Sequence, residues 1–327
     1  MLNIVVTGCA GYIGSKLTHQ LLCNGHSVIG IDNLKYQQNF VVDKLRWMEC
    51  KPKTFDRNFH FINDDLMYDD WLEYTNGADV IIHLAALVGA PICNLHKREY
   101  VHDINVRSVQ QLIKHISKNQ LVLFPNTNSG YGVADKNSVC TEESPMNPIS
   151  EYGITKCLAE NIVLQHENSV AFRLATVFGV SPRMRFDLMV NDFVLKAYID
   201  KKIEVFEPNF RRNFIHIQDV CDAFVFAIDN HVKMRQNVYN LGQDRANTTK
   251  GELAKIVCEI VGGEVTYKDG KDPDQRDYNV SSKKIMNAGF IPSITLHSGI
   301  SEVNSYCQML GLEFMKTDIF KRSTRNA

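Results

Sequence analysis

A glycine-rich segment near the start of the chain constrains its fold more than any other feature. Residues Thr7–Gly14 (TGCAGYIG) follow a short apolar run, Asn3–Val6, and lead into a helix-length segment. An apolar run, a glycine turn and a helix in that order predict a strand whose following loop binds phosphate. Gly8 would make the tight turn, Gly11 would let a pyrophosphate approach the amides at the helix N-terminus, and Gly14 would let the helix pack closely on the strand.

Short apolar runs rich in Ile and Val alternate with helix-length segments through the first half of the chain. This alternation predicts a parallel sheet with crossover helices, a doubly wound α/β fold of the Rossmann type. The further runs expected to form strands are Ser27–Ile31, His60–Ile62, Asp79–His83, Leu121–Phe124 and Val170–Leu174. The helices expected between and after them are Ile13–Cys23, Arg98–Lys118, Tyr152–Gln165, Thr249–Val261 and Ser298–Leu310.

The regular alternation weakens after residue 178, which predicts a two-domain organisation. Residues 1–178 are expected to form the dinucleotide-binding domain and residues 179–327 a smaller, discontinuous substrate domain. A strand and a helix near 213–245 are expected to return to the first domain, with Phe214–Val220 and Val238–Leu241 as the candidate strands.

Acidic residues at two positions refine the cofactor prediction. Asp32 ends the second apolar run, 18 residues after Gly14, close to the offset of about 20 residues at which a carboxylate accepts hydrogen bonds from the adenosine ribose. Because a carboxylate there would repel a 2′-phosphate, NAD is favoured over NADP. Asp65, chosen over Asp64, is expected to meet the adenine amino group. The other expected cofactor contacts are Tyr12, Ile13, Asn33, Leu66, Leu84, Ala85 and Ala86.

A tyrosine and a lysine four residues apart indicate acid–base chemistry. On a helix, Tyr152 and Lys156 would lie on one face. A phenol with its ordinary pKa near 10 is a poor base at pH 7, but Lys156 and a positively charged nicotinamide ring would both lower that pKa. Thr127 follows the fifth apolar run and would hydrogen-bond the same substrate oxygen, with Ser129 as second choice. Without a catalytic role, Tyr152 and Lys156 would be an ordinary pair on an exposed helix face. Thr127 and Ser129 would then belong to a Ser/Asn turn whose side chains hydrogen-bond their own backbone.

Together these residues resemble the extended short-chain dehydrogenase/reductases that act on nucleotide sugars, the NAD-dependent epimerase/dehydratase family. The resemblance includes the blocks His83–Ala86, Val177–Gly179 and Arg212–His216, as well as Asn105, Arg173, Asp219 and Arg276. It implies catalysis by Thr127, Tyr152 and Lys156, and binding of the substrate diphosphate by Arg212 and Arg276. Asn128, Ser129, Arg185 and Asn191 are also expected to contact the substrate, whereas Arg183 and Arg211 are expected to be ordinary surface residues. Homodimers built from two paired helices are usual in the family, and Arg98–Lys118 with Tyr152–Gln165 would supply them.

The loop Thr127-Asn128-Ser129 narrows the reaction. Family members that remove water across C5 and C6 resemble Thr-Asp-Glu here, and decarboxylases also tend to place a glutamate in this loop. Loss of a C6 hydroxyl needs a proton donor and a base at C5, so we expect neither reaction. Oxidation of the sugar C4 hydroxyl remains, ending at the ketone or continuing to 4-epimerisation.

More specific blocks, at residues 125–132, 140–145 and 175–185, resemble the GDP-D-glycero-D-manno-heptose 4-dehydrogenases of bacterial capsular polysaccharide synthesis. Thr176 and Val88 differ from the asparagine and lysine that many hexose 4-epimerases have at these positions. The main expectation is therefore a GDP-heptose 4-dehydrogenase, and the alternative is a 4-epimerase of a UDP- or GDP-hexose. A dinucleotide-binding scaffold without chemistry is disfavoured, because it would have no use for the Tyr152/Lys156 pair.

Charge and composition exclude other classes of partner. Lys+Arg 36 against Asp+Glu 37 gives a net charge of −1, which argues against nucleic-acid or anionic-membrane binding. The nine cysteines show no C-x-x-C spacing and the eleven histidines show no metal-ligand spacing, so we expect no disulfide framework and no metal site. No apolar run is long enough to span a membrane, and we expect a cytoplasmic protein.

Overall fold

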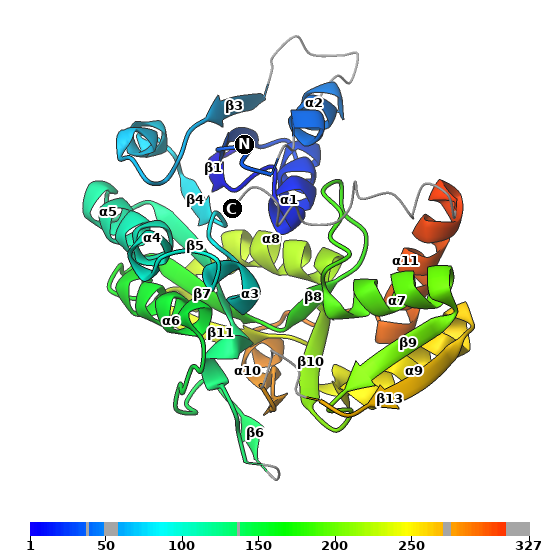
Figure 1. Ribbon diagram of the computed structural model, residues 1–327. Helices are drawn as coiled ribbons and strands as arrows, with labels where there is room; N and C mark the ends of the chain where they lie inside the picture. Colours follow the sequence, from blue (N-terminus) through cyan, green and yellow to red (C-terminus); the bar gives the residue numbers. More distant parts are fainter. Residues whose placement is uncertain (37–38, 49–57, 136–137, 271–275, 312–327) are drawn as a thin grey trace.

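A seven-stranded parallel sheet forms the centre of the computed structural model, which describes residues 1–36, 39–48, 58–135, 138–270 and 276–311 (Figure 1). The strands lie in the order β11-β7-β5-β4-β1-β2-β3. Their bounds are β1 (Asn3–Thr7), β2 (Ser27–Asp32), β3 (Phe59–Asn63), β4 (Val80–His83), β5 (Leu121–Thr127), β7 (Ser169–Leu174) and β11 (Asn237–Leu241). The chain winds outward in one direction from β1 to β3 and in the other from β4 to β11. The doubly wound α/β fold expected from the sequence is therefore confirmed, with a topological switch point between β1 and β4.

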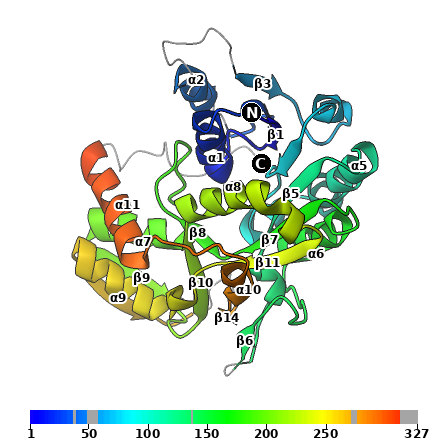
Figure 2. The same cartoon turned by 180° about the vertical axis from the view of Figure 1, so that it is seen from behind.

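Helices cover both faces of this sheet because its strands bury side chains alternately on each side. Ile4 and Val6 of β1 join one apolar cluster, and Val5 between them joins another. One face carries α1 (Tyr12–Cys23), α2 (Asn39–Met48) and α8 (Ile217–Met234). The other carries α3 (Ala90–Cys93), α4 (Arg98–His102), α5 (Ser108–His115) and α6 (Glu151–Val163). Figure 2 shows α1 and α8 side by side on the first face.

The helix expected over Arg98–Lys118 is shorter and less regular than predicted. A π-helical segment, Asp103–Arg107, joins α4 to α5, and the run ends at His115 because Ile116 is extended. Within the π segment, Asn105 accepts a hydrogen bond from the Leu87 amide at 2.8 Å and donates to the Leu87 carbonyl at 3.1 Å. The π segment thus holds the loop after β4 in place, which is typical of π-bulges near functional sites.

A second lobe stands against the carboxyl end of the sheet (Figure 1). It contains a three-stranded sheet, β12-β10-β8, and the parallel pairs β13-β9 and β14-β6. Its strands are β6 (Val139–Cys140), β8 (Thr176–Phe178), β9 (Lys202–Phe206), β10 (Arg211–His216), β12 (Asn247–Thr249), β13 (Glu264–Lys268) and β14 (Asn279–Val280). Its helices are α7 (Met189–Asp200), α9 (Lys250–Val261), α10 (Lys283–Asn287) and α11 (Leu296–Leu310).

The two strands predicted to return to the large sheet behave differently. Residues 237–241 form β11 at its edge, whereas Phe214–Val220 is not one strand. β10 ends at His216, whose ring accepts a hydrogen bond from the Gln218 amide at 3.2 Å and so caps α8. β10 pairs with β8 in the second lobe rather than with the large sheet. The domain boundary at residue 178 stays a prediction.

A buried ion pair fastens α6 to the sheet. Glu160 of α6 and Arg173 of β7 are 3% and 6% exposed, and Arg173 Nη2 donates to Glu160 Oε1 at 2.7 Å. Arg173 Nη1 also donates to the Tyr131 hydroxyl and to the Glu142 carbonyl, both at 3.0 Å. Asn126 Nδ2 donates to the same carboxylate. These partners satisfy both buried charges, which an interior ion pair requires.

No helix in the described ranges is long and apolar enough to cross a membrane. Those ranges also hold no cluster of three or more His, Cys, Asp or Glu side chains suited to a metal ion. The eight cysteines within them are not in disulfides, and Cys50 lies outside the described residues.

Removing one charge of the buried pair should destabilise the fold strongly. We expect Arg173→Met to lower the free energy of unfolding by about 3–5 kcal/mol, because it leaves the Glu160 carboxylate buried without its partner. Arg98→Ala is the control, since Arg98 is 67% exposed in its ion pair with Glu151 and should contribute less than about 1 kcal/mol. Urea unfolding followed by circular dichroism measures both, and similar losses from the two variants would contradict this account.

Candidate active site

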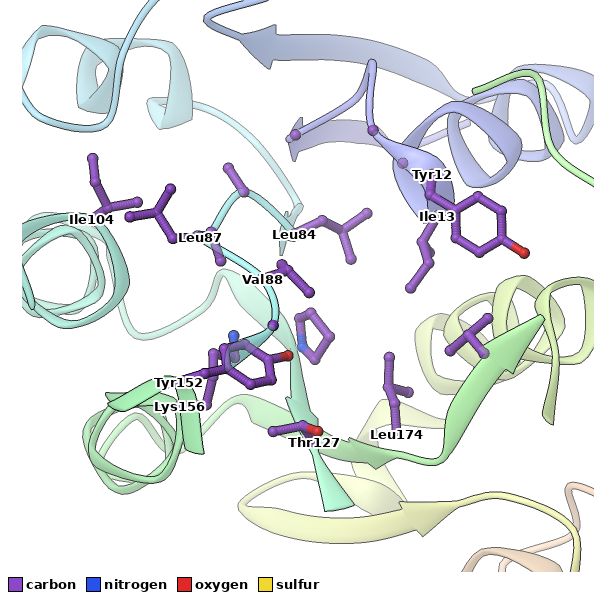
Figure 3. A pocket seen from close by; sticks show the side chains of 18 of the residues that line it. Tyr12, Ile13, Leu84, Leu87, Val88, Ile104, Thr127, Tyr152, Lys156 and Leu174 are labelled. Atoms are coloured by element: carbon purple, nitrogen blue, oxygen red, sulfur yellow. The ribbon is translucent and has the colours of Figure 1, made fainter. Parts of the chain in front are cut away.

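A cavity of about 350 Å³ runs along the carboxyl edge of the large sheet, between the two lobes. Open α/β sheets bind their ligands at this edge, beside the switch point. Figure 3 shows Tyr152, Lys156 and Thr127 together on one side and Tyr12 and Ile13 on the other, with Leu84 and Val88 between. Most of the predicted site residues line it: Gly8, Gly11, Tyr12, Ile13, Gly14, Asp32, Asn33, Asp65, Leu66, Leu84, Ala85, Ala86, Thr127, Ser129, Tyr152, Lys156, Arg185 and Arg276.

The glycine loop forms a cradle that side chains would fill. Gly8 has φ +71°, and a Cβ there would lie 2.8 Å from the Ala85 amide nitrogen. A Cβ on Gly14 would overlap the Gly8 carbonyl oxygen. Helix α1 begins after Gly11 with no side-chain cap and no acidic residue in its first turn. Its first amides therefore face the cavity without a competing carboxylate, and the loop fits the diphosphate of a dinucleotide.

Two carboxylates lie at the far end of this cradle. Asp32 ends β2 and accepts hydrogen bonds from the amides of Ala10 at 3.1 Å and Leu34 at 2.9 Å. Burial raises the pKa of this carboxyl above its ordinary value, and the two amides oppose that shift. Asp65 accepts from Asn33 Nδ2 at 2.9 Å. Both carboxylates are thus held in fixed orientations, as hydrogen bonding to a ribose and an adenine ring would require.

Helix α6 presents the tyrosine and the lysine to the cavity. Ser150 caps the helix by accepting from the Gly153 amide at 3.2 Å, which sets its start just before Tyr152. Lys156 is only 4% exposed, and its Nζ lies 3.9 Å from the centroid of the Phe124 ring. Burial lowers the pKa of Lys156 to about 7, and the nearby Glu160 carboxylate opposes that shift. A cation in this position is costly without a partner, which indicates a functional reason for it.

The phenol of Tyr152 is surrounded by groups that act on its ionisation. Burial raises its pKa to about 12, while the charge of Arg276 and a hydrogen bond with Thr127 act to lower it. Thr127 Oγ1 lies 2.8 Å from Ser129 Oγ, and Arg276 Nη1 donates to that Ser129 hydroxyl. The phenol, two hydroxyls and a guanidinium thus converge on one point in the cavity.

Three residues predicted to bind substrate do not line the cavity. Asn128 is 1% exposed in the turn between Thr127 and Ser129. Asn191 lies beneath the site, where it donates to the Arg185 carbonyl at 2.9 Å and accepts from the Gly179 amide at 3.1 Å. Arg212 is fully buried and donates to the backbone carbonyls of Arg211 and Arg276. In this structure, Asn191 and Arg212 position the cavity wall instead of forming it.

The cavity is also lined by residues that the sequence analysis did not predict as contacts. Lys35, Tyr36 and Tyr100 lie at the end that contains Asp65, with Lys35 Nζ 5.2 Å from the centroid of the Tyr100 ring. Arg183, expected on the surface, also lines the cavity. The only local signal for Lys35 and Tyr36 is their position just after Asp32, and Tyr100 and Arg183 reach the cavity through tertiary packing.

The parallel sheet, the glycine cradle and the Thr127–Tyr152–Lys156 set define a dinucleotide-dependent oxidoreductase of the Rossmann class. Residues 4–242 match the model of the NAD dependent epimerase/dehydratase family. The chain belongs to this family of nucleotide-sugar enzymes, and NAD is its cofactor.

Individual relatives cover nearly the whole chain. An uncharacterised UDP-glucose epimerase of Bacillus subtilis is 27% identical over 323 residues, which are 94% of this chain and 99% of that protein. A putative UDP-glucose 4-epimerase of Methanocaldococcus jannaschii is 27% identical over 92% of this chain and 96% of its own length. The UDP-glucuronic acid 4-epimerase of Bacillus cereus, solved with UDP-glucuronic acid and NAD, has a TM-score of 0.80 at 23% identity, covering 95% of this chain and 100% of that one. The dTDP-glucose 4,6-dehydratase of Bacillus anthracis, solved with NAD, has a TM-score of 0.79 at 23% identity, with coverages of 94% and 97%.

Replacing the buried lysine should stabilise the cofactor-free protein. The unfolded lysine, with its ordinary pKa of 10.5, holds a proton above about pH 7 that the folded protein has released. Stability of the native protein therefore rises with pH between about 7 and 10.5. Lys156→Met removes this cost, and we expect a gain of a few kcal/mol near pH 7 that shrinks as the pH rises.

Melting temperatures of both proteins at neutral and alkaline pH, without cofactor, measure this gain. A Met variant that is less stable than the native protein near pH 7, or a difference that does not change with pH, would contradict the burial of an ionisable amine at this position.

Proposed function

We propose that this protein oxidises the C4 hydroxyl of a nucleotide sugar with NAD and then reduces the ketone from the other face, as a nucleotide-sugar 4-epimerase. The observation that carries the proposal is the convergence of Thr127, Ser129 and Tyr152 on one point, beside a cradle that fits a dinucleotide. The family supports the chemistry, and the relatives named above as UDP-sugar 4-epimerases support this outcome over net oxidation.

In this mechanism Tyr152 accepts the proton of the C4 hydroxyl, and Thr127 hydrogen-bonds the same oxygen. NAD held by the glycine cradle would supply the acceptor for the hydrogen that leaves C4 with its electron pair, which would turn the alcohol into a ketone. Arg276 and a protonated Lys156 favour the phenolate by their positive charge. The lysine's low pKa makes its protonation sensitive to nearby charge, and the anionic diphosphate of the cofactor would raise it.

The residues beside Thr127 support oxidation at C4 without loss of water. Asn128 is an amide buried in its turn, and Ser129 is a hydroxyl that already accepts from Arg276. Neither side chain is a carboxyl group that could donate a proton to a C6 hydroxyl or remove one from C5. We therefore propose that this protein catalyses neither 4,6-dehydration nor decarboxylation.

A GDP-heptose 4-dehydrogenase of capsular polysaccharide synthesis is the second candidate. It is supported by the resemblance of residues 125–132, 140–145 and 175–185, while the relatives reported above carry UDP- and dTDP-sugar names. Both candidates share the C4 oxidation and differ in whether the ketone is released. The substrate test therefore also identifies the nucleotide of the substrate, GDP or UDP.

We also propose a homodimer through the paired helices α5 and α6. These helices pack on each other on one face of the sheet. Leu158 of α6 is 41% exposed, as expected for a side chain that a second copy would cover.

A panel of nucleotide sugars tests the reaction. We incubate the protein with UDP-glucose, UDP-glucuronic acid, GDP-mannose and GDP-heptose, with and without added NAD, and analyse the products by mass spectrometry and NMR. The proposal predicts interconversion of C4 epimers without net NADH. Tyr152→Phe should lower kcat by at least about 10²-fold, because it removes the proton acceptor.

Phe40→Tyr provides a matched control, since Phe40 is 57% exposed on α2 and does not line the cavity. A 4-keto product with one NADH per turnover would favour the dehydrogenase over the epimerase. Undiminished turnover by Tyr152→Phe, or a 4-keto-6-deoxy product, would overturn the mechanism itself.

A further inference from the structure

The segment Gly179–Arg185, between β8 and α7, reaches from the second lobe across to the glycine cradle. Tyr12 of α1 donates its hydroxyl to the Gly179 carbonyl at 2.7 Å, and Lys16 Nζ donates to the Val180 carbonyl at 3.0 Å. Ser181 Oγ donates to the Tyr12 carbonyl at 2.6 Å. Figures 1 and 2 both show this loop lying beside α1. We call residues 179–185 the strap.

The strap carries two arginines into the cavity, and they differ in how they are held. Arg185 is engaged by the Asp187 carboxylate, at 3.0 Å from Nε and 2.6 Å from Nη2. Arg183 donates Nη1 to the neighbouring Met184 carbonyl at 2.7 Å, and no carboxylate within the described ranges forms an ion pair with it. Both side chains line the same cavity as Gly11 and Asp32.

Arg183 lines the cavity within electrostatic reach of its opposite wall. The charged and ionisable groups that act on its guanidinium are Arg185, Asp187, Tyr36 and Asp32. Tyr36 and Asp32 belong to the first lobe, at the adenosine end of the cradle, and both Asp32 oxygens already accept backbone hydrogen bonds. A guanidinium carried by the second lobe thus shares the cavity with Tyr36 and Asp32 of the first lobe and is affected by their charge.

We propose that Arg183 clamps the cofactor, binding the NAD diphosphate from the side opposite to the α1 amides. Guanidinium forks form charge-assisted, bidentate hydrogen bonds with phosphate oxygens. The α1 amides would hold the diphosphate from the first lobe and Arg183 from the second, so that the cofactor bridges both lobes. This inference rests on the proposed function, because it requires that the cavity binds a dinucleotide.

Binding of the cofactor diphosphate by Arg183 would favour epimerisation over net oxidation. An epimerase must keep its cofactor in both redox states until the ketone is reduced, whereas a dehydrogenase must release NADH after each turnover. A contact to the diphosphate stabilises the oxidised and the reduced forms equally, because the redox change occurs on the nicotinamide ring. Arg183 therefore favours retention of the cofactor, and so in-place reduction of the ketone.

Cofactor binding by Arg183→Gln tests the clamp without relying on turnover. We would strip the native and variant proteins of cofactor, titrate them with NAD and with NADH by calorimetry, and also measure the dinucleotide that copurifies with each. We expect both dissociation constants to rise by about 10- to 100-fold, as loss of a charge-assisted hydrogen bond predicts. The KM for the nucleotide sugar at saturating NAD should change less than about twofold.

Arg245→Gln is the matched control, because this second-lobe arginine hydrogen-bonds Gln243 and Ser293 and does not line the cavity. Ser181→Ala removes an anchor of the strap without removing charge, and it should weaken NAD binding less than Arg183→Gln does. If Arg183→Gln does not fold, Arg183→Lys keeps the charge and loses the fork, and it should still bind NAD more weakly than the native protein.

Native affinity for NAD and NADH in a folded Arg183 variant would overturn the clamp and leave the proposed function intact. Failure of the native protein itself to bind NAD would overturn both. A loss of NAD affinity equal in Arg183→Gln and Arg245→Gln would also contradict the clamp, because it would reflect the net charge of the lobe rather than this contact.

Discussion

One buried carboxylate, Glu160, holds helix α6 to the sheet and offsets the charge of Lys156. It receives two N–H groups of Arg173 from β7 and the amide of Asn126 from β5. It is also the group that acts most strongly to raise the pKa of Lys156 against the effect of burial. Tyr152, Lys156 and Glu160 follow one another at four-residue intervals, so one face of α6 carries the phenol, the ammonium and the anchor. The position of the phenol in the cavity therefore depends on an ion pair in the core.

The parts of the fold that local patterns specify were predictable. The alternation of short apolar runs with helix-length segments indicated β1 to β5, β7 and the helices α1 and α6, because parallel strands buried on both faces read as apolar runs. The π segment at Asn105 was not predictable, since its cause is a pair of hydrogen bonds to Leu87 on another loop. The end of β10 at His216 likewise depends on a ring that caps α8. The second lobe pairs short strands from distant parts of the chain, and short strands leave little periodic signal.

The candidate site also contains residues that local patterns predicted and residues that only tertiary contacts bring into place. Spacing alone predicted Tyr152 and Lys156 on one helix face, and the glycine pattern predicted the tight turn at Gly8 and the close packing at Gly14. The sequence could not predict which arginines line the cavity, because the position of each side chain depends on partners that are distant in the sequence. Arg212 is drawn into the core by the Arg276 carbonyl, and Arg183 enters the cavity because Ser181 and Gly179 dock on α1. These contacts turn a residue expected on the surface into a candidate for holding the cofactor.

In the proposed mechanism, the phenol of Tyr152 takes the proton from the sugar's C4 hydroxyl while the C4 hydrogen leaves. Single-turnover kinetics with the preferred nucleotide sugar of the panel, deuterated either at C4 or at C5, tests this most directly when followed by the absorbance of reduced nicotinamide. We expect a slower transient with deuterium at C4, no effect of deuterium at C5, and a rate that rises with pH through one ionisation that Tyr152→Phe abolishes. A transient that is insensitive to deuterium at C4, or one whose pH dependence survives in Tyr152→Phe, would contradict it.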